Sequence, residues 1–277
     1  PSMSNPLYDG VFAPHADSTK TFLYTADRDI SFAEFTALTD RIAAMLVAQG
    51  VAPGDRVAVQ ADKSVLLFAL YAATVKAGGV YLPLNTGYTP AELDYFLRDA
   101  KPQIVVTSNA AAEAITPIAA RIGAVLMTLD GDESGSLSEA AMQHEGSFTA
   151  VRRGSEDLAA ILYTSGTTGR SKGAKLCHRN LRSNAEVLRE YWRFTADDTL
   201  LHMLPIYHTH GLFVAGNLLA MVGGSMIFLQ KFSADVALKW MPKATSMMGV
   251  PTFYTRLLDH EGFTGKALSH MRLFLSG

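Results

Sequence analysis

The sequence of 277 residues has little of what marks secreted, nucleic-acid-binding or membrane proteins. Its single cysteine, Cys177, excludes an internal disulfide framework and suits a reducing compartment such as the cytoplasm. Formal net charge is only −2, and no run of Lys or Arg exceeds two residues, which argues against a nucleic-acid partner. Apolar runs are too short to span a bilayer and no signal-peptide pattern is evident, so we expect no membrane partner.

Apolar segments alternate between helix-like and strand-like patterns along most of the chain. With 48% hydrophobic residues, the sequence can fill one large core or two modest ones. Two capping boxes, Ser31 with Glu34 and Thr89 with Glu92, predict the starts of helices. Short apolar runs predict buried strands between the helices, at 56–60, 80–84, 103–108 and 124–129.

Two stretches interrupt this alternation. The segment 110–123 predicts a helix broken at Pro117, because proline lacks the N–H that the next helical hydrogen bond needs. Residues 130–156 contain few bulky apolar groups and are expected to form a surface connection. Beyond them strand and helix patterns alternate again to the last residue, which predicts an α/β fold of layered sheets with flanking helices. Ligands usually bind at the carboxyl ends of such strands.

The stretch YTSGTTGRSKGA, residues 163–174, is expected to be a loop joining two strands. Glycines allow backbone angles that turn N–H groups inward, and the hydroxyls, Arg170 and Lys172 add donors and positive charge, a combination that suits a polyphosphate. A plain solvated loop is the alternative, because Gly, Ser and Thr are common loop residues. The P-loop of nucleoside triphosphatases does not fit, since Ser171 stands where that motif needs glycine and Gly173 follows the lysine.

Together with three other segments, this stretch resembles the acyl-adenylate-forming superfamily, which includes acyl-CoA synthetases, adenylation domains and luciferases. YTSGTTGRSKGA is similar to its phosphate-loop signature, and GGVYLPLN (78–85) to its upstream motif. MLPIYHTHGL (203–212) resembles its acyl-pocket motif, and GVPTFYTRLL (249–258) the helix that follows. Among the members, PIYHTHGLFVAGN followed by MMGVPTFYTRLL is most similar to malonyl-CoA synthetases.

The resemblance implies a ligase that joins a carboxylate to ATP, releases pyrophosphate and passes the acyl group to the thiol of coenzyme A. It implies that the loop cradles the phosphates through Thr164, Ser165, Gly166, Thr167, Thr168, Gly169 and Lys172. Lys172 and Thr167 are implied to act in catalysis together with His208. The implied co-substrates and cofactor of the full-length enzyme are ATP, coenzyme A and Mg²⁺, and the implied acid is a small dicarboxylic acid.

His208, Thr209 and His210 are implied to line the acyl pocket. Two histidines one residue apart could instead bind a metal on a strand, but no third ligand is apparent and we expect no metal site. A hydrogen-bonded pair at a strand end is another alternative. The motif also lacks the Asp with which adenylation domains hold an amino acid, which argues against that substrate.

Arg256 and Ser276 are implied to bind the second carboxylate of a malonate-like acid. Apolar residues flank Arg256, and a guanidinium at the edge of such a helix can grip a carboxylate with two parallel hydrogen bonds. An ordinary solvated surface arginine is the alternative. A fatty-acid ligase would have no use for this charge in its acyl tunnel.

Superfamily members continue beyond the position that matches Gly277, into segments that bind adenine, ribose and magnesium and a small domain with a catalytic lysine. We therefore expect residues 1–277 to be an incomplete N-terminal part of the large AMP-binding domain, inactive alone and open to self-association through an edge near Leu273–Ser276. A dicarboxylate ligase in the full-length parent, a CoA ligase for another small carboxylate and a phosphate-binding module without turnover remain the candidate functions.

Overall fold

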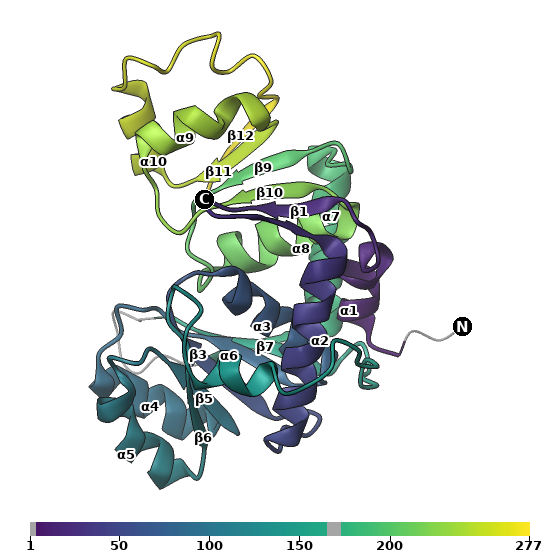
Figure 1. Ribbon diagram of the computed structural model, residues 1–277, viewed down its shortest axis with the longest axis vertical. Coiled ribbons are helices and arrows are strands. Elements are labelled where there is room, and N and C mark those ends of the chain that lie inside the picture. Colours follow the sequence, from purple (N-terminus) through teal and green to yellow (C-terminus); the bar gives the residue numbers. More distant parts are fainter. Residues whose placement is uncertain (1–3, 165–172) are drawn as a thin grey trace. The chain divides into compact units, whose positions relative to one another are not determined.

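The computed structural model describes residues 4–164 and 173–277, which fold into two compact units (Figure 1). The first unit contains Pro1–Gly10 and Thr36–Ser183, and the second contains Val11–Phe35 and Asn184–Gly277. Each unit has one six-stranded sheet flanked by helices, which confirms the expected α/β fold. Every helix within the described ranges is too short or too polar to cross a membrane.

The sheet of the first unit has the order β6-β5-β3-β4-β7-β8 and is parallel except for its last strand. Its strands are β3 (Arg56–Gln60), β4 (Val80–Pro83), β5 (Ile104–Thr107), β6 (Val125–Thr128), β7 (Leu158–Tyr163) and β8 (Gly173–Cys177). The chain runs from β3 to β4 in one direction and then returns past β3 to β5 and β6. Because right-handed crossovers then place the following helices on opposite faces, the loops after β3 and β5 diverge and leave a crevice between them.

The helices of the first unit follow the sequence signals closely. They are α1 (Pro6–Val11), α2 (Phe32–Ala48, beginning in the second unit), α3 (Val65–Lys76), α4 (Pro90–Ala100), α5 (Ala112–Ile122) and α6 (Ser136–Ala141). Both capping boxes are present: the Glu34 N–H donates to Ser31 Oγ (3.0 Å), and the Glu92 N–H donates to Thr89 Oγ1 (3.3 Å). All twelve residues of α3 are buried, as its nearly unbroken apolar sequence predicts.

Two sequence predictions for the first unit are wrong. Helix α5 continues through Pro117, which is exposed, so the Glu113 carbonyl that loses its helical partner can bond to water. The segment 130–156 is more than a connection, because it contains α6. Leu137 and Ala141 anchor this short helix by burying its apolar side.

The sheet of the second unit has the order β12-β11-β9-β10-β1-β2 and is parallel except for β2. Its strands are β1 (Thr21–Tyr24), β2 (Asp29–Ser31), β9 (Thr199–His202), β10 (Ser225–Phe228), β11 (Ser246–Gly249) and β12 (Leu273–Ser276). Its helical segments are η1 (Ala13–His15), most of α7 (His178–Trp192), the π-helix η2 (His210–Gly216), α8 (Asn217–Val222), α9 (Ala234–Trp240), η3 (Met241–Lys243) and α10 (Pro251–Leu258).

Strand β12 is the edge of this sheet and is more exposed than its neighbour. All four residues of β11 are buried, whereas those of β12 alternate between half-buried and exposed, and Phe274 is 39% exposed. On one side, β12 pairs in parallel with β11. The apolar edge expected near Leu273–Ser276 is therefore present, and self-association through it stays a prediction.

Candidate functional site

The hairpin of β7 and β8 brings the two ends of the glycine–hydroxyl stretch together. Tyr163, the last residue of β7, pairs directly with Gly173, the first residue of β8, and Thr164 after it is exposed. The structure thus places strands on both sides of the stretch, as expected. The other predicted phosphate-binding residues lie outside the described residues: Ser165, Gly166, Thr167, Thr168, Gly169 and Lys172.

Gly173 is required by the way this hairpin packs. A Cβ atom at this position would lie 2.6 Å from Ile161 Cγ2 and 3.0 Å from Tyr163 Cζ, closer than real Cβ atoms normally approach. The absence of a side chain therefore lets the Tyr163 ring lie across the second strand of the hairpin. The centroid of the Tyr163 ring is also 4.7 Å from that of Phe96, so a residue of α4 packs against the base of the stretch as well.

Side-chain hydrogen bonds connect the carboxyl ends of three strands in the first unit. Gln60 Nε2, at the end of β3, donates to the carbonyls of Asn85 (2.9 Å) and Tyr88 (3.1 Å), which follow β4. The Tyr88 hydroxyl donates to the Tyr163 carbonyl at the end of β7 (3.2 Å). The Tyr163 hydroxyl in turn donates to Asp99 Oδ2 on α4 (2.5 Å), and burial followed by the Asp99 carboxylate raises the pKa of the Tyr163 phenol.

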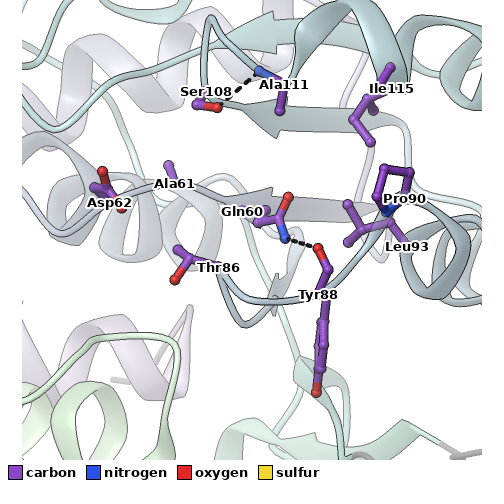
Figure 2. Close-up of a pocket in the computed structure, with 11 residues that line it drawn as sticks. Gln60, Ala61, Asp62, Thr86, Tyr88, Pro90, Leu93, Ser108, Ala111 and Ile115 are labelled. Atoms are coloured by element: carbon purple, nitrogen blue, oxygen red, sulfur yellow. Dashed lines mark hydrogen bonds between the residues drawn. The ribbon is translucent and has the colours of Figure 1, made fainter.

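A pocket of about 230 Å³ lies at the divergent loops of this sheet (Figure 2). Its lining comes from the segments after β3, β4 and β5 and from the first turns of α4 and α5, and includes Gln60, Asp62, Thr86, Tyr88, Pro90 and Ser108. Figure 2 shows the Tyr88 backbone beside Gln60 and the Tyr88 ring directed away from the other labelled side chains. Tyr88 therefore contributes to the pocket wall and to the support of β7.

In the second unit, a buried histidine fixes the segment that carries the predicted acyl-pocket residues. His202, fully buried at the end of β9, makes a 2.7 Å hydrogen bond through Nε2 to the Gly211 carbonyl in η2. A Cβ atom at Gly211 would lie only 2.1 Å from the Pro205 carbonyl oxygen, so the backbone can turn this closely only at a glycine. A π-helix is a rare geometry that is frequent at functional sites.

His208, Thr209 and His210 lie at the start of this segment and are exposed. Partial burial, with the charge of the neighbouring His210, lowers the pKa of His208, so its imidazole is neutral at physiological pH and can accept a hydrogen bond. The His210 ring lies against the end of β12, since a Cβ atom at Gly277 would be 2.8 Å from His210 Cδ2. The structure thus brings His208 and His210 together, with His210 beside the strand that ends in Ser276.

Arg256 is exposed in the last turn of α10 and has no carboxylate partner among the described residues. Its guanidinium lies 4.7 Å from the centre of the Phe232 ring, which stacks on Phe253. Two residues earlier, the Tyr254 hydroxyl donates to the carbonyls of Leu275 and Met247 in the sheet. Because two residues subtend about 200° on an α-helix, Arg256 leaves α10 on a different face from the one that contacts β12, so the structure does not join it to Ser276.

Metal-binding side chains do not gather in the part of the chain that the structure describes: no group of three or more His, Cys, Asp or Glu could hold an ion. Cys177 is buried, and its Sγ lies 3.0 Å from Asn180 Oδ1. The thiol is therefore a small packed side chain and not a ligand or nucleophile.

Several supporting residues of these sites were missed by reasoning from sequence alone. Gln60 and His202 are polar groups that end apolar strand segments, a signal that could have singled them out, whereas Tyr88 lies between β4 and α4 and has no such signal. The partner of Tyr163 could not have been found in this way, because Asp99 is one of several acidic residues on α4 and only the fold shows which one faces the tyrosine.

The comparisons with known proteins agree with this geometry. The chain is 35% identical over 224 residues to the mitochondrial malonate–CoA ligase ACSF3 of Mus musculus, covering 76% of this chain and 37% of that protein. It is 54% identical to MatB from Rhodopseudomonas palustris, with a TM-score of 0.96 to the apo crystal structure over 99% of this chain and 55% of that one.

The structure of ATP-bound MatB from the same organism is also 54% identical and gives a TM-score of 0.95, covering all of this chain and 55% of that one. The chain therefore spans only part of the proteins that it resembles, 37% of the mouse ligase and 55% of MatB. The family of AMP-binding enzymes matches residues 13–277, and the chain belongs to this family.

Proposed function

We propose that this chain is part of an ATP-dependent acid–thiol ligase that forms malonyl-CoA or a closely related short dicarboxyl-CoA. The observation that carries the proposal is the likeness to MatB over nearly the whole chain, at 54% identity, together with relatives named malonate–CoA ligases. The AMP-binding family supports an AMP-forming CoA ligase, and the choice of acid rests on the relatives and on the pocket residues.

The reaction has two steps. A carboxylate oxygen attacks the α-phosphorus of ATP, the bond to the bridging oxygen breaks, and pyrophosphate leaves with the electron pair. The thiolate of coenzyme A then attacks the acyl carbon of the adenylate, and AMP leaves. In the first step, charge accumulates on the pyrophosphate, so donors fixed around it stabilise the transition state.

The glycine–hydroxyl stretch supplies such donors in this proposal. Lys172 and Thr167 take part in catalysis. The residues that surround the phosphates are Thr164, Ser165, Gly166, Thr167, Thr168, Gly169 and Lys172. His208, Thr209 and His210 line the acyl side, where the neutral His208 offers an acceptor or a donor without adding a charge. The hairpin base at Tyr163 and Gly173 supports the first group, and the bond from His202 to η2 supports the second.

Magnesium is expected with ATP in this family, and the described residues contain no group of three or more His, Cys, Asp or Glu side chains that could hold an ion without the phosphates. No step is therefore assigned to it. The cytoplasmic location also stays a proposal, and it rests on the scarcity of cysteine in the sequence, which has Cys177 alone. The mouse relative is named mitochondrial, and that name applies to the relative alone.

Arg256 is the residue that we assign to the second carboxylate, with Ser276 beside the acyl site. The guanidinium is exposed over Phe232 with no acidic partner among the described residues, so it is available to an incoming carboxylate. An acid that lacks this group, such as acetate, cannot make these charge-assisted hydrogen bonds to the guanidinium, so the site should select for dicarboxylates over monocarboxylates.

The test uses the full-length protein. Wild type should catalyse malonate-dependent exchange of pyrophosphate into ATP, with methylmalonate next and acetate far behind. Arg256→Ala should lower kcat/KM for malonate by at least about a hundredfold, as expected when a charged hydrogen-bonding group is lost from a polar site, while the affinity for ATP stays unchanged. Arg152→Ala, which removes an exposed arginine before β7, is the matched control. Equal use of malonate by Arg256→Ala and wild type would show that Arg256 is a surface residue.

A second candidate function is a phosphate-binding module without turnover. It is favoured by the fact that the chain spans 55% of MatB. Assaying the 277 residues beside the full-length protein separates the two: ATP binding without acyl-CoA formation by the 277 residues supports the module, and turnover at the full-length rate contradicts it. If the full-length protein prefers another small carboxylate to malonate, the ligase assignment stands and only the assigned acid changes.

A further inference from the structure

The end of β7 has unusually little support from its parallel neighbour. Among the described residues, the register between β4 and β7 contains one pair, Tyr81 with Ala160, whereas β3 pairs with β4 and with β5 at four positions each. The last three residues of β7 therefore extend beyond this ladder. They lead directly into the stretch that the proposed function assigns to the phosphates of ATP.

A tyrosine hydroxyl supports the strand where this ladder stops. Tyr88 donates to the Tyr163 carbonyl (3.2 Å), and the Tyr88 backbone is itself held by Gln60 Nε2 (3.1 Å). The second hydroxyl, that of Tyr163, is anchored on α4 through Asp99 (2.5 Å). Strand ends β3 and β7 and helix α4 are thus joined by one continuous set of hydrogen bonds.

Aromatic packing limits the movement of both tyrosines. The ring centroid of Phe96 lies 5.0 Å from that of Tyr88 and 4.7 Å from that of Tyr163. Each ring is therefore held in place by packing, so a Tyr→Phe change removes only a hydroxyl and leaves the packed ring. The contribution of the hydrogen bonds can be measured separately from that of the core.

We propose that Tyr88 and Tyr163 are positioning residues that fix the carboxyl end of β7, and with it the start of the phosphate-binding stretch, through the Gln60–Tyr88–Tyr163–Asp99 hydrogen-bond set. This inference rests on the proposed function and adds three supporting residues, Gln60, Tyr88 and Asp99, that lie outside the phosphate-loop motif. In this proposal neither tyrosine contacts the substrate. Their effect is on the placement of donors that must be aimed at developing charge before the reaction begins.

The first experiment measures ATP and acid separately in the full-length protein. Tyr88→Phe and Tyr163→Phe should each raise KM for ATP about three- to tenfold, the range expected for one hydrogen bond, and leave KM for the carboxylic acid and the thermal midpoint near wild type. Tyr191→Phe removes a hydroxyl from a tyrosine that is 79% exposed in the second unit and should change nothing. A general structural role would instead change both KM values and the midpoint together.

Asp99 provides a graded second test that does not depend on either ring. Asp99→Ala removes the acceptor of the Tyr163 hydroxyl and should weaken ATP binding, whereas Asp99→Asn retains an acceptor oxygen and should restore most of the affinity. Unchanged ATP affinity in Tyr88→Phe, Tyr163→Phe and Asp99→Ala, beside a wild type that binds ATP, would overturn the inference alone. A wild type that does not bind ATP would overturn the proposed function, and the positioning role with it.

Discussion

The two units have the same size of sheet but hold their candidate site residues in different ways. In the first unit, side chains at the carboxyl ends of the strands are tied to each other and to α4, and the neighbouring helix α3 is buried at all twelve positions. In the second unit, Arg256 lies on α10, which buries only Leu257, and Ser276 lies on a half-exposed edge strand.

This difference fits two different chemical tasks in the proposed function. The phosphates of ATP are the same in every reaction of such a ligase, so donors held by a densely bonded framework can serve all of them. The acid varies between relatives, and residues on exposed elements can be substituted at little cost to the core. We expect substitutions in the first unit to cost more stability, and those at the exposed part of the second to change specificity.

The largest expected contrast is between the ion pairs of the two units. In the first, Lys76 Nζ lies 2.5 Å from Asp40 Oδ1 with both side chains 8% exposed. Burial alone would lower the pKa of Lys76, but the bond to Asp40 and the nearby Tyr8 raise it. Asp40→Ala strands a buried ammonium and should lower the free energy of unfolding by about 3–5 kcal/mol.

The matched variant in the second unit is Asp198→Ala. Asp198 accepts two hydrogen bonds from Arg272 (2.8 and 2.9 Å), but Arg272 is 38% exposed and also donates to the carbonyls of Trp192 and Arg193. The guanidinium left behind can therefore be hydrated, and the loss should be about 1–3 kcal/mol. Urea denaturation measures both variants, and equal losses would contradict the role assigned to burial.

The next contrast is in the response to acid. His178 in the first unit is fully buried, and its Nδ1 accepts a hydrogen bond from the Leu7 N–H (3.2 Å). Burial, aided by the charge of Arg153 and opposed by Asp157 and Asp9, lowers the pKa of His178 to about 4. The unfolded chain, with an ordinary histidine pKa near 6.5, binds the proton first, so this contribution to stability is complete above about pH 6.5 and is lost as the pH falls to about 4.

The expected loss over this window is about 3 kcal/mol, from 1.36 kcal/mol for each pKa unit. In the second unit, Asp198 responds to acid at lower pH than His178: burial would raise the pKa of Asp198, but hydrogen bonds from Arg272, Thr195 and Thr245 lower it. Its contribution is therefore lost only as the pH falls below about 4. His178→Asn should flatten the free energy of unfolding between pH 6.5 and 4, and an unchanged slope would show that His178 is not the group responsible.

The sequence predicts the helices and strands well and the side-chain contacts between them poorly. Strand and helix periodicity located nearly all elements after residue 31, and both capping boxes formed, because these signals are local. The β1–β2 hairpin was missed, although β1 has the same four-residue length as most of the strands that were located. Helix α5 passes through Pro117 because one lost hydrogen bond at an exposed position is tolerated, which the local pattern does not reveal.

For the candidate site too, the sequence located the segments but did not predict the contacts between them. The motifs located the hairpin that flanks the glycine–hydroxyl stretch and the segment with His208 and His210. The structure places the base of this hairpin at the carboxyl end of β7 and the second segment after β9. The contact of Arg256 with Phe232 depends on the tertiary packing of α10 and has no sequence signal. The same holds for the bond between Tyr88 and Tyr163, which are 75 residues apart in the chain.

Two glycine substitutions compare how much stability each unit loses when a Cβ atom is added to its backbone. We expect the larger loss in the second unit. Gly211→Ala places a Cβ atom 2.1 Å from the Pro205 carbonyl oxygen, and this backbone contact cannot move without disturbing η2. Gly173→Ala meets side-chain atoms instead, Ile161 Cγ2 at 2.6 Å and Tyr163 Cζ at 3.0 Å, which have to shift. We expect losses of about 3 kcal/mol for Gly211 and about 1–2 kcal/mol for Gly173 in the free energy of unfolding.

The control for both is Gly265→Ala, which has no heavy atom within 4 Å of the new Cβ. Its unfolding midpoint should match wild type within error, because nothing is displaced. A Gly211→Ala variant as stable as Gly265→Ala would mean that the turn before η2 is able to relax, and the rigidity assigned to this segment would be wrong.

The smallest expected effect compares one helix cap from each unit. Ser64 Oγ accepts a hydrogen bond from the Leu67 N–H (3.0 Å) at the start of the fully buried α3, and Ser233 Oγ accepts one from the Val236 N–H (3.3 Å) at the start of the more exposed α9. Both residues have the extended backbone of an N-cap. Ser64→Ala leaves a buried N–H without a partner, whereas water can replace the hydroxyl in Ser233→Ala. We therefore expect losses of about 1–2 and about 0.5 kcal/mol respectively. Chemical denaturation, with hydrogen exchange of the Leu67 and Val236 amides, measures both, and a larger loss for Ser233→Ala would show that burial of the helix start does not set the strength of the cap.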